Sequence, residues 1–262
     1  MFVNDDFNKI LHPHWTQLLI GGGQSKLSKS TLRLQFDSAN EDRYTDAEIN
    51  DTFPRKSSYV WKPPLRMIVK ARMSHPSGTL QGTAGFGFWN APFSNHGIWR
   101  TLPKSVWFFY SSPKSNMSLV PGNPGWGWKA QVIHTLRPEA ALYALPLTLT
   151  MGYAKMSGNI KPAHHFMKKF VGAEETILLA DMTNWHTYTL DWLPEKAIFR
   201  VDNKKVFESS LSPSGSLCFV AWIDNWYAIA TPKGELKFGR CVSKSQWLDI
   251  DSIKIESLSK AK

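Results

Sequence analysis

The chain has 262 residues, of which 42% are hydrophobic and 20% charged, and this balance excludes a disordered chain and allows a large packed core. The formal net charge is +10, but the basic residues are scattered and form no stripe that alternates with aromatics, which argues against nucleic-acid recognition. No apolar run reaches the roughly 18 residues of a transmembrane helix, and the acidic start of the chain lacks a signal-peptide pattern. We therefore expect a cytoplasmic protein with a basic, solvated surface, for which a membrane surface is a less favoured partner than a small-molecule or carbohydrate ligand.

Short stretches of alternating polar and apolar residues, separated by Gly, Pro and Ser turns, recur along the chain and predict strands. In chain order they are Leu18–Ile20, Thr31–Phe36, Arg66–Met73, Thr83–Trp89, Ser105–Tyr110, Lys129–Thr135, Trp185–Trp192, Ala197–Asp202, Ser216–Ile223 and Leu248–Ile255. The charged, Pro-terminated stretch Asp37–Pro54 is expected to be a loop. So many short strands indicate a single β-sandwich or barrel domain over residues 1–262.

One segment, residues 138–171, departs from the strand pattern. Its apolar residues and its punctuation predict one helix over about 138–156 and a second over about 162–171, with Pro146 kinking or ending the first. Both helices are too apolar to stand in water, so they must pack on another surface. This helical insertion is read as a lid over a groove. It could instead be a plug that only covers apolar sheet, or a segment that lies on a membrane surface.

Several of the predicted strands carry specific motifs. Gly82-Thr83-Ala84-Gly85-Phe86-Gly87-Phe88-Trp89 resembles the "G-T-x-P-A-x-W" strand of glycoside hydrolase family 16, and Lys129–His134 resembles the short strand ending in His of that family. Trp185–Trp192, followed by Phe199–Lys204, resembles "F-H-x-Y-x-x-x-W" and "x-x-V-D-G". The resemblance implies an all-β, concanavalin A-like jelly-roll β-sandwich with a concave carbohydrate groove, here carrying the helical insertion.

This chain has no acids in the strand that is catalytic in the resembled family. That strand carries "E-x-D-x-x-E" in the family, which places carboxylates on one face of the sheet through the two-residue period of a strand. The segment in that position here is Lys104-Ser105-Val106-Trp107-Phe108-Phe109-Tyr110-Ser111, without a carboxylate. Retaining hydrolysis needs two carboxyl groups about 5 Å apart. The resemblance therefore transfers the fold and the groove but not the hydrolase chemistry.

Aromatic residues near the expected groove are the main ligand-binding candidates, because Trp stacks well on flat apolar ligand faces. Alternation puts Trp107 and Phe109 on one face of their strand and Val106, Phe108 and Tyr110 on the other. The polar tip of Tyr110 favours the second set for the groove. The predicted ligand-binding residues are Trp89, Asn90, Trp107, Phe108, Trp126, Trp128, Trp222, Asn225 and Trp226.

Asp224 is the leading candidate for chemistry, because it follows an apolar strand directly and stands between Trp222 and Trp226. A carboxylate walled by two Trp residues would have a raised pKa, which suits acid–base catalysis, although an Asp-Asn pair also commonly caps a turn. His134 could pair with Asp224, and Tyr110 could assist. No metal or cofactor is predicted, because Cys218 and Cys241 lack zinc-site spacing and no phosphate-binding glycine loop is present.

Three functions remain open. The first is a ligand-binding protein that holds a carbohydrate or an apolar small molecule in a Trp-rich groove without glycosidase chemistry. The second is a small-molecule isomerase, cyclase or lyase that uses Asp224 under the helical insertion. The third is a glycoside hydrolase with relocated carboxylates.

Overall fold

The computed structural model describes residues 2–8, 10–51, 59–90, 103–117, 120, 122–135, 171–230 and 236–258. Strands make up all of the regular structure in these ranges, and none of the described residues is helical. Of the predicted helical insertion, residues 138–170 lie outside the described residues. Val171, which was predicted to end the second helix, is the first residue of a strand. Within the described ranges no helix is long and apolar enough to cross a membrane.

The strands form two large antiparallel sheets. The eight-stranded sheet has the order β14 (Lys204–Ser209), β13 (Ala197–Val201), β12 (His186–Trp192), β6 (Leu65–Met73), β18 (Gln246–Ser257), β4 (Leu32–Phe36), β3 (Gln24–Leu27), with β1 (Phe2–Asp5) paired to β18. The seven-stranded sheet has the order β11 (Val171–Ile177), β10 (Gly127–Thr135), β8 (Lys104–Ser111), β7 (Thr83–Trp89), β15 (Cys218–Asp224), β5 (Asp46–Asn50), β2 (Thr16–Ile20).

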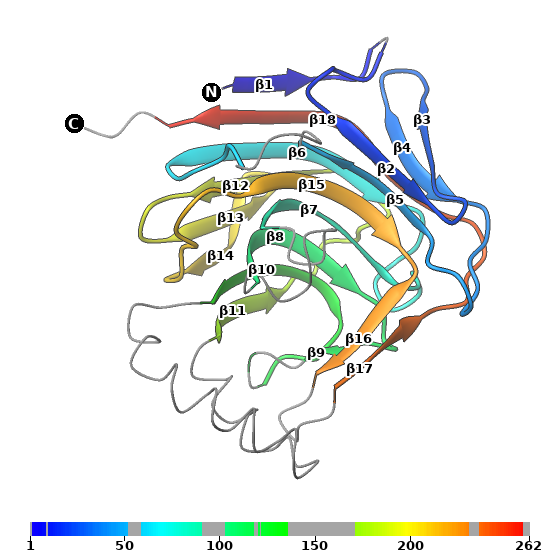
Figure 1. The fold of residues 1–262 in the computed structure, drawn as a ribbon. Coiled ribbons are helices and arrows are strands. Elements are labelled where there is room, and N and C mark those ends of the chain that lie inside the picture. Colours follow the sequence, from blue (N-terminus) through cyan, green and yellow to red (C-terminus); the bar gives the residue numbers. More distant parts are fainter. Residues whose placement is uncertain are drawn as a thin grey trace.

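The two sheets pack as layers that bend in the same direction. Figure 1 shows β6, β12 and β18 in the outer layer and β15, β7, β8 and β10 in the inner one. A single large core cluster fills the space between them, and it takes alternate residues from every long strand, such as Met67, Val69 and Ala71 of β6. The seven-stranded sheet therefore has a core face and an opposite face, called here the concave face.

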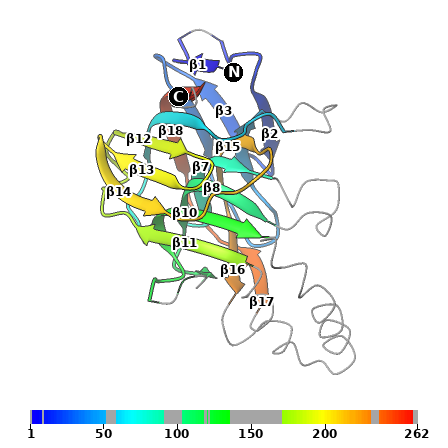
Figure 2. The same cartoon turned by 90° about the vertical axis from the view of Figure 1, so that its left-hand side faces the viewer.

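A small third sheet extends from one end of the sandwich. It contains β17 (Leu236–Arg240), β16 (Trp226–Ala230) and β9 (Asn116–Met117), and β16 follows the core strand β15 after only one residue. Figures 1 and 2 both place it at the end opposite the paired strands β1 and β18.

The predicted strands are confirmed, but the sheet edges hold strands that the sequence analysis did not predict. The expected loop Asp37–Pro54 is wrong, because β5 (Asp46–Asn50) lies inside it and pairs with both β2 and β15. Ala47 and Ile49 of β5 point into the core, and Glu48 between them points to the concave face. The strand was not predicted because charged residues dominate this segment and β5 has only two apolar residues, Ala47 and Ile49.

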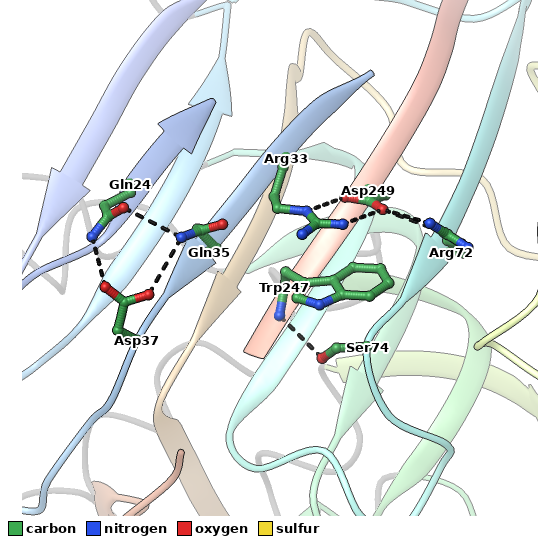
Figure 3. Close-up of polar contacts among 8 residues, drawn as sticks. All are labelled: Gln24, Arg33, Gln35, Asp37, Arg72, Ser74, Trp247 and Asp249. Carbon is green, nitrogen blue, oxygen red and sulfur yellow. Dashed lines mark hydrogen bonds and ion pairs between the residues drawn. The ribbon is translucent and has the colours of Figure 1, made fainter. Parts of the chain in front are cut away.

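The outer face of the eight-stranded sheet is tied together by buried aspartates that each bind two arginines. Asp249 of β18 accepts hydrogen bonds from Arg33 of β4 at 2.7 and 2.8 Å and from Arg72 of β6 at 3.2 and 3.3 Å, as Figure 3 shows. The Arg33 guanidinium also lies 4.3 Å from the ring centroid of Trp247. Asp191 of β12 is held in the same way by arginines of β6 and β13. These pairs join neighbouring strands across the convex side of the molecule.

Candidate functional site

Four aromatic side chains gather on the concave face, and we call them the aromatic patch: Trp89, Trp107, Phe109 and Trp222. Trp107 is at its centre. Its ring centroid lies 5.9 Å from that of Trp89, 5.2 Å from that of Phe109 and 5.1 Å from that of Trp222. Trp89 and Trp107 are half-buried, whereas Phe109 and Trp222 are buried. The patch is thus a continuous aromatic surface that presents two indole rings to solvent.

Glycines in β7 make room for this patch. The register pairs Trp222 of β15 with Gly85, and Gly87 with Trp107 of β8. A Cβ at Gly85 would come within 3.1 Å of the Trp222 ring, and one at Gly87 within 2.5 Å of the Trp107 Cβ. Because β7 carries no side chain at these two positions, rings from the strands on either side can meet above it.

A buried polar network holds the Trp107 ring from one side. The Trp107 indole Nε1 donates to Gln131 Oε1 at 2.8 Å, and Gln131 Nε2 donates to Glu175 Oε2 at 2.6 Å. Lys129 Nζ donates to the other Glu175 oxygen at 2.9 Å, and both charged side chains are almost fully buried. Since every bond fixes the next residue, the indole has a defined orientation before any ligand arrives.

A second network holds the Trp222 ring from the other side. Trp222 Nε1 donates to Thr83 Oγ1 at 2.9 Å, and Thr83 Oγ1 donates to Asp224 Oδ1 at 2.9 Å. Asp224 Oδ1 also accepts from the backbone N–H groups of Thr83 and Trp226, both at 3.0 Å, and Tyr44 Oη donates to Asp224 Oδ2 at 3.2 Å. Asp224 therefore caps the turn after β15 and anchors the indole.

Asp224 belongs to a group of three acids that we call the carboxylate cluster. Asp46 of β5 lies directly opposite Asp224 in the register, and Glu48 lies directly opposite Trp222. All three acids are buried, at 1%, 4% and 9% exposure for Asp46, Asp224 and Glu48. Burial raises the pKa of Asp224 to about 6 and that of Glu48 to about 7, and it raises the pKa of Asp46 well above its usual value, with further contributions from Glu48 and Asp224. At neutral pH the cluster can hold a proton, which ordinary carboxyl groups cannot.

The predicted assignment of the two faces of β8 is wrong. Phe108 and Tyr110 are fully buried in the core between the sheets, whereas Trp107 and Phe109 face the concave side. The Tyr110 hydroxyl donates to Leu80 O at 2.8 Å and accepts from Gly78 N at 3.1 Å, and burial raises its pKa to about 12. Trp128 also lies in the core with no exposed surface. Tyr110, Phe108 and Trp128 therefore cannot contact a ligand on the concave face.

His134 does not lie near Asp224. The row of paired residues that contains Asp224 continues through Thr83 and Ser111 and meets β10 at Gly127. His134 is seven residues further along β10, or about 23 Å at the rise of a strand. The predicted pair of His134 and Asp224 is thus excluded, and the acids next to Asp224 come from β5 instead.

The two predicted asparagines are buried among backbone groups. Asn90 Oδ1 accepts from Lys104 N at 3.0 Å, where β7 ends beside the start of β8. Asn225 has no exposed surface; its Oδ1 accepts from Thr45 N at 3.0 Å and its Nδ2 donates to three backbone carbonyl groups. Both side chains thus bind backbone groups beside the concave face rather than joining the aromatic patch.

The last two predicted tryptophans lie outside the aromatic patch. Trp126 is exposed at 38% and stands just before β10, with its ring over Gly78. Trp226 stacks on Phe238 of the small sheet, with centroids 5.3 Å apart and an interplanar angle of 10°. Of the predicted aromatic residues, the structure thus brings Trp89, Trp107 and Trp222 together.

Several residues of this site were missed by the sequence analysis, namely Tyr44, Asp46, Glu48, Thr83, Lys129, Gln131 and Glu175. For β5 a signal existed, because Asp46-Ala-Glu-Ile-Asn50 alternates polar and apolar residues as a strand does. Among the described residues no group of His, Cys, Asp and Glu side chains is arranged to hold a metal ion. The geometry of the carboxylate cluster therefore does not match a metal site.

Comparison with known proteins identifies the fold. No protein-family model matches the sequence, and no curated protein matches it. Among solved structures, the chain is similar to a glycoside hydrolase family 16 endo-glucanase from Bacteroides ovatus, with a TM-score of 0.54, 14% identity, and coverage of 97% of this chain and 99% of that one.

Two further solved structures show the same similarity of fold. A β-glucanase from Bacillus licheniformis has a TM-score of 0.51 and 10% identity, with 98% of each chain covered. An endo-β-galactosidase from Clostridium perfringens has a TM-score of 0.52 and 12% identity; the match covers 97% of this chain and 61% of that one. At these identities the likeness establishes the fold, a jelly-roll β-sandwich of the glucanase type.

Proposed function

We propose that this chain, which has the fold of glycoside hydrolase family 16 glucanases, is a carbohydrate-binding protein whose ligand stacks on the aromatic patch of the concave face. The observation that carries the proposal is the position of Trp107. It lies on β8, next to the middle strand β7 of the seven-stranded sheet, is half-buried, and has three further aromatic rings beside it.

Stacking on Trp is the usual way to bind a sugar, because each pyranose has an apolar face formed by its C–H groups. The indole of Trp107 is already oriented by Gln131 and Glu175, so little side-chain entropy is lost when a ligand binds. The similar solved structures support the choice of ligand class. One of them is a Bacteroides ovatus family 16 enzyme in complex with an oligosaccharide product.

The absence of acids on β8 favours binding without retaining glycosidase chemistry. The side chains that β8 directs to the concave face are Ser105, Trp107, Phe109 and Ser111, as the pairing with Trp89, Gly87, Gly85 and Thr83 requires. Retaining hydrolysis uses two carboxyl groups about 5 Å apart, one on each side of the reacting bond. Aromatic rings at these positions can hold a sugar but can neither attack it nor protonate it.

The carboxylate cluster supports a second candidate function, an enzyme with acid–base chemistry. Asp224 and Glu48 have pKa values of about 6 and about 7, and groups that titrate near neutral pH suit proton transfer. In this candidate either a glycoside or another small molecule would react beside Trp222. Neither His134 nor Tyr110 would take part, because the first lies at the far end of β10 and the second in the core.

One experiment separates the two functions. Purified protein is titrated with a mixed-linkage β-glucan tetrasaccharide and with laminarin by calorimetry, and the same mixtures are assayed for new reducing ends. Binding without cleavage is expected, and Trp107→Ala should weaken it about tenfold or more, since a ring stack contributes roughly 1–1.5 kcal/mol. Trp247→Ala, on the outer sheet, is the matched control and should bind normally. Cleavage that is lost in Asp224→Asn would establish the enzyme instead.

A further inference from the structure

The small third sheet carries a second pair of aromatic rings, Trp226 of β16 and Phe238 of β17, which we call the end stack. The ring centroids lie 5.3 Å apart with an interplanar angle of 10°. Phe238 is 50% exposed and Trp226 is half-buried, so the end stack presents aromatic surface to solvent. This is the same kind of surface that the aromatic patch offers to a sugar ring.

The pairing of the strands shows which face of the small sheet carries the end stack. Ala228 of β16 pairs with Phe238, and the next residue, Ile229, points to the opposite face. Ile229 pairs in parallel with Asn116 of β9, so Met117 lies on the same face as Ala228 and Phe238. The end stack and Met117 therefore share one face of the small sheet.

The opposite face of the small sheet is covered by the chain itself. Tyr227 of that face is buried, and its ring lies against Gly239 of β17. The Lys114 ammonium lies 4.8 Å from the Tyr227 ring centroid and also binds Glu41. The face with the end stack is therefore the one that has aromatic surface left for a ligand.

Met117 joins the face of the end stack to the concave face of the large sheet. Its side chain packs against the apolar cluster that contains Phe109 and Trp222 of the aromatic patch. Because β16 follows β15 after one residue, Trp222 and Trp226 are four residues apart, which is at most about 14 Å between Cα atoms. The end stack thus lies on the same side of the molecule as the aromatic patch and close to it.

The bend between β15 and β16 is held by buried hydrogen bonds. Asn225 Nδ2 donates to three backbone carbonyl groups, and the backbone oxygen of Asn225 accepts from Cys241 N at 2.6 Å. The backbone N–H of Trp226 donates to Asp224 Oδ1 at 3.0 Å. The end stack therefore has a defined position relative to β15 before a ligand binds, which lowers the entropic cost of using both surfaces.

We propose that the end stack is a second sugar-binding surface of the same site, and that the ligand is an oligosaccharide chain long enough to contact the end stack and the aromatic patch together. This rests on the proposed carbohydrate-binding function and names its ligand class, an extended chain rather than a mono- or disaccharide. A long chain makes a stacking contact on each surface, whereas a short one makes a contact on one of them. Since the second contact of a linked ligand costs little further translational freedom, affinity rises with chain length.

Oligomers of β-1,3-linked glucose with two, four and six residues, each titrated by calorimetry, test the proposal. The hexasaccharide is expected to bind about tenfold or more tightly than the disaccharide, which is the contribution of one further ring stack. Phe238→Ala should remove most of this gain and leave binding of the disaccharide within about twofold. Phe2→Ala removes a ring that is 61% exposed on β1; it is the matched control and should keep the gain.

The indole N–H resonance of Trp226 provides a second measurement, which does not depend on the folding of Phe238→Ala. In the wild-type protein this resonance should shift on addition of the hexasaccharide and stay in place on addition of the disaccharide. The resonance of Trp107 should shift with both, because the aromatic patch binds chains of either length.

The outcomes separate this inference from the proposed function. A disaccharide that binds as tightly as the hexasaccharide would overturn the role of the end stack and leave carbohydrate binding intact. A gain with chain length that survives Phe238→Ala, with the Trp226 resonance unmoved, would place the additional contact elsewhere and also overturn it. If no oligomer binds, and neither mixed-linkage glucan nor laminarin does, the proposed function itself is wrong.

Discussion

The indole rings of Trp107 and Trp222 lie with their centroids 5.1 Å apart, although they belong to strands that are not neighbours in the sheet. The strand between them, β7, has glycine at both positions that face them. Each indole N–H is bound by a separate polar chain, one ending at Glu175 and the other at Asp224. The aromatic patch is thus held by a hydrogen-bond chain on each side, and its two indole rings meet above the glycines of β7.

The hydroxyl of Thr83 should be essential for the position of Trp222, because it accepts from the indole and donates to Asp224. Thr83→Val keeps the shape of the side chain and leaves a buried indole N–H and one carboxylate oxygen with fewer partners. We expect a loss of about 1–3 kcal/mol in the free energy of unfolding, measured by urea denaturation. Thr176→Val, on the edge strand β11, should change it by less than about 0.5 kcal/mol. Equal effects of the two substitutions would remove Thr83 from this role.

The stability of the protein should fall as pH rises from about 5 to about 8. The folded-state pKa values of Glu48, about 7, and Asp224, about 6, lie above those of unfolded carboxyl groups, so the folded state binds more protons in this window. Their stabilising contribution is complete below the unfolded pKa and is lost as pH rises through the folded pKa. Asp191, whose pKa is lowered, loses its contribution only below about pH 4.

Thermal denaturation measured across that range checks this expectation. The melting temperature of the wild-type protein should be higher at about pH 5 than at about pH 8. Glu48→Gln should flatten the profile, because the glutamine cannot ionise. A profile that is unchanged by this substitution, or that rises with pH, would show that the cluster is not the group that titrates.

Gly87 should tolerate no side chain. A Cβ there would lie 2.5 Å from Trp107 Cβ and 2.7 Å from Val106 O, and the φ of 152° is one that L side chains rarely adopt. Gly87→Ala is therefore expected to destabilise the protein by about 1–3 kcal/mol and to weaken glycan binding, because Trp107 must shift. Adding Trp107→Ala should not restore stability, since the clash involves the backbone and Cβ of that residue. Full rescue in the double variant would place the conflict in the ring instead.

Asp249 should matter for stability and not for glycan binding. It is 1% exposed and binds both Arg33 and Arg72 on the outer face of the molecule. Asp249→Ala leaves Arg33 and Arg72, each about one-third exposed, without their carboxylate partner, although both still stack on Trp rings. We expect a loss of about 1–3 kcal/mol in the free energy of unfolding after allowance for solvent screening. Binding titrations of the folded variant should match those of the wild-type protein. A large loss of affinity would point to a ligand on the convex side.

The sequence predicted the fold well because strand alternation and turn residues are local signals. Most inner strands, such as Thr83–Trp89, appear where the alternation placed them. The strand Asp46–Asn50 was missed because its acids dominate its composition, and these acids are buried only through pairing with β15, which is a long-range contact. The local alternation of Asp46–Asn50 could have indicated a strand, but not its pairing with β15, and that pairing is what assembles the carboxylate cluster.

The face of β8 could not be decided from alternation, which separates two sets of residues without saying which set points inward. The polar tip of Tyr110 favoured the wrong set, because Leu80 O and Gly78 N satisfy its hydroxyl inside the core. The glycines of β7 are the better indicator. Where large rings lie across a strand, that strand needs residues without a side chain. Gly85 and Gly87 therefore indicate the face of the sheet on which Trp107 and Trp222 meet.

The most direct test of the central claim is to follow the indole N–H resonances of the tryptophans by NMR during a titration with mixed-linkage glucan tetrasaccharide and, separately, with laminarin. Single Trp→Phe variants assign the resonances. If the aromatic patch binds the glycan, the resonances of Trp89, Trp107 and Trp222 shift with a common dissociation constant, while those of Trp185 and Trp247 on the outer sheet stay in place. Shifts confined to the outer-sheet tryptophans, or no shifts at saturating glycan, would contradict a carbohydrate site on the concave face.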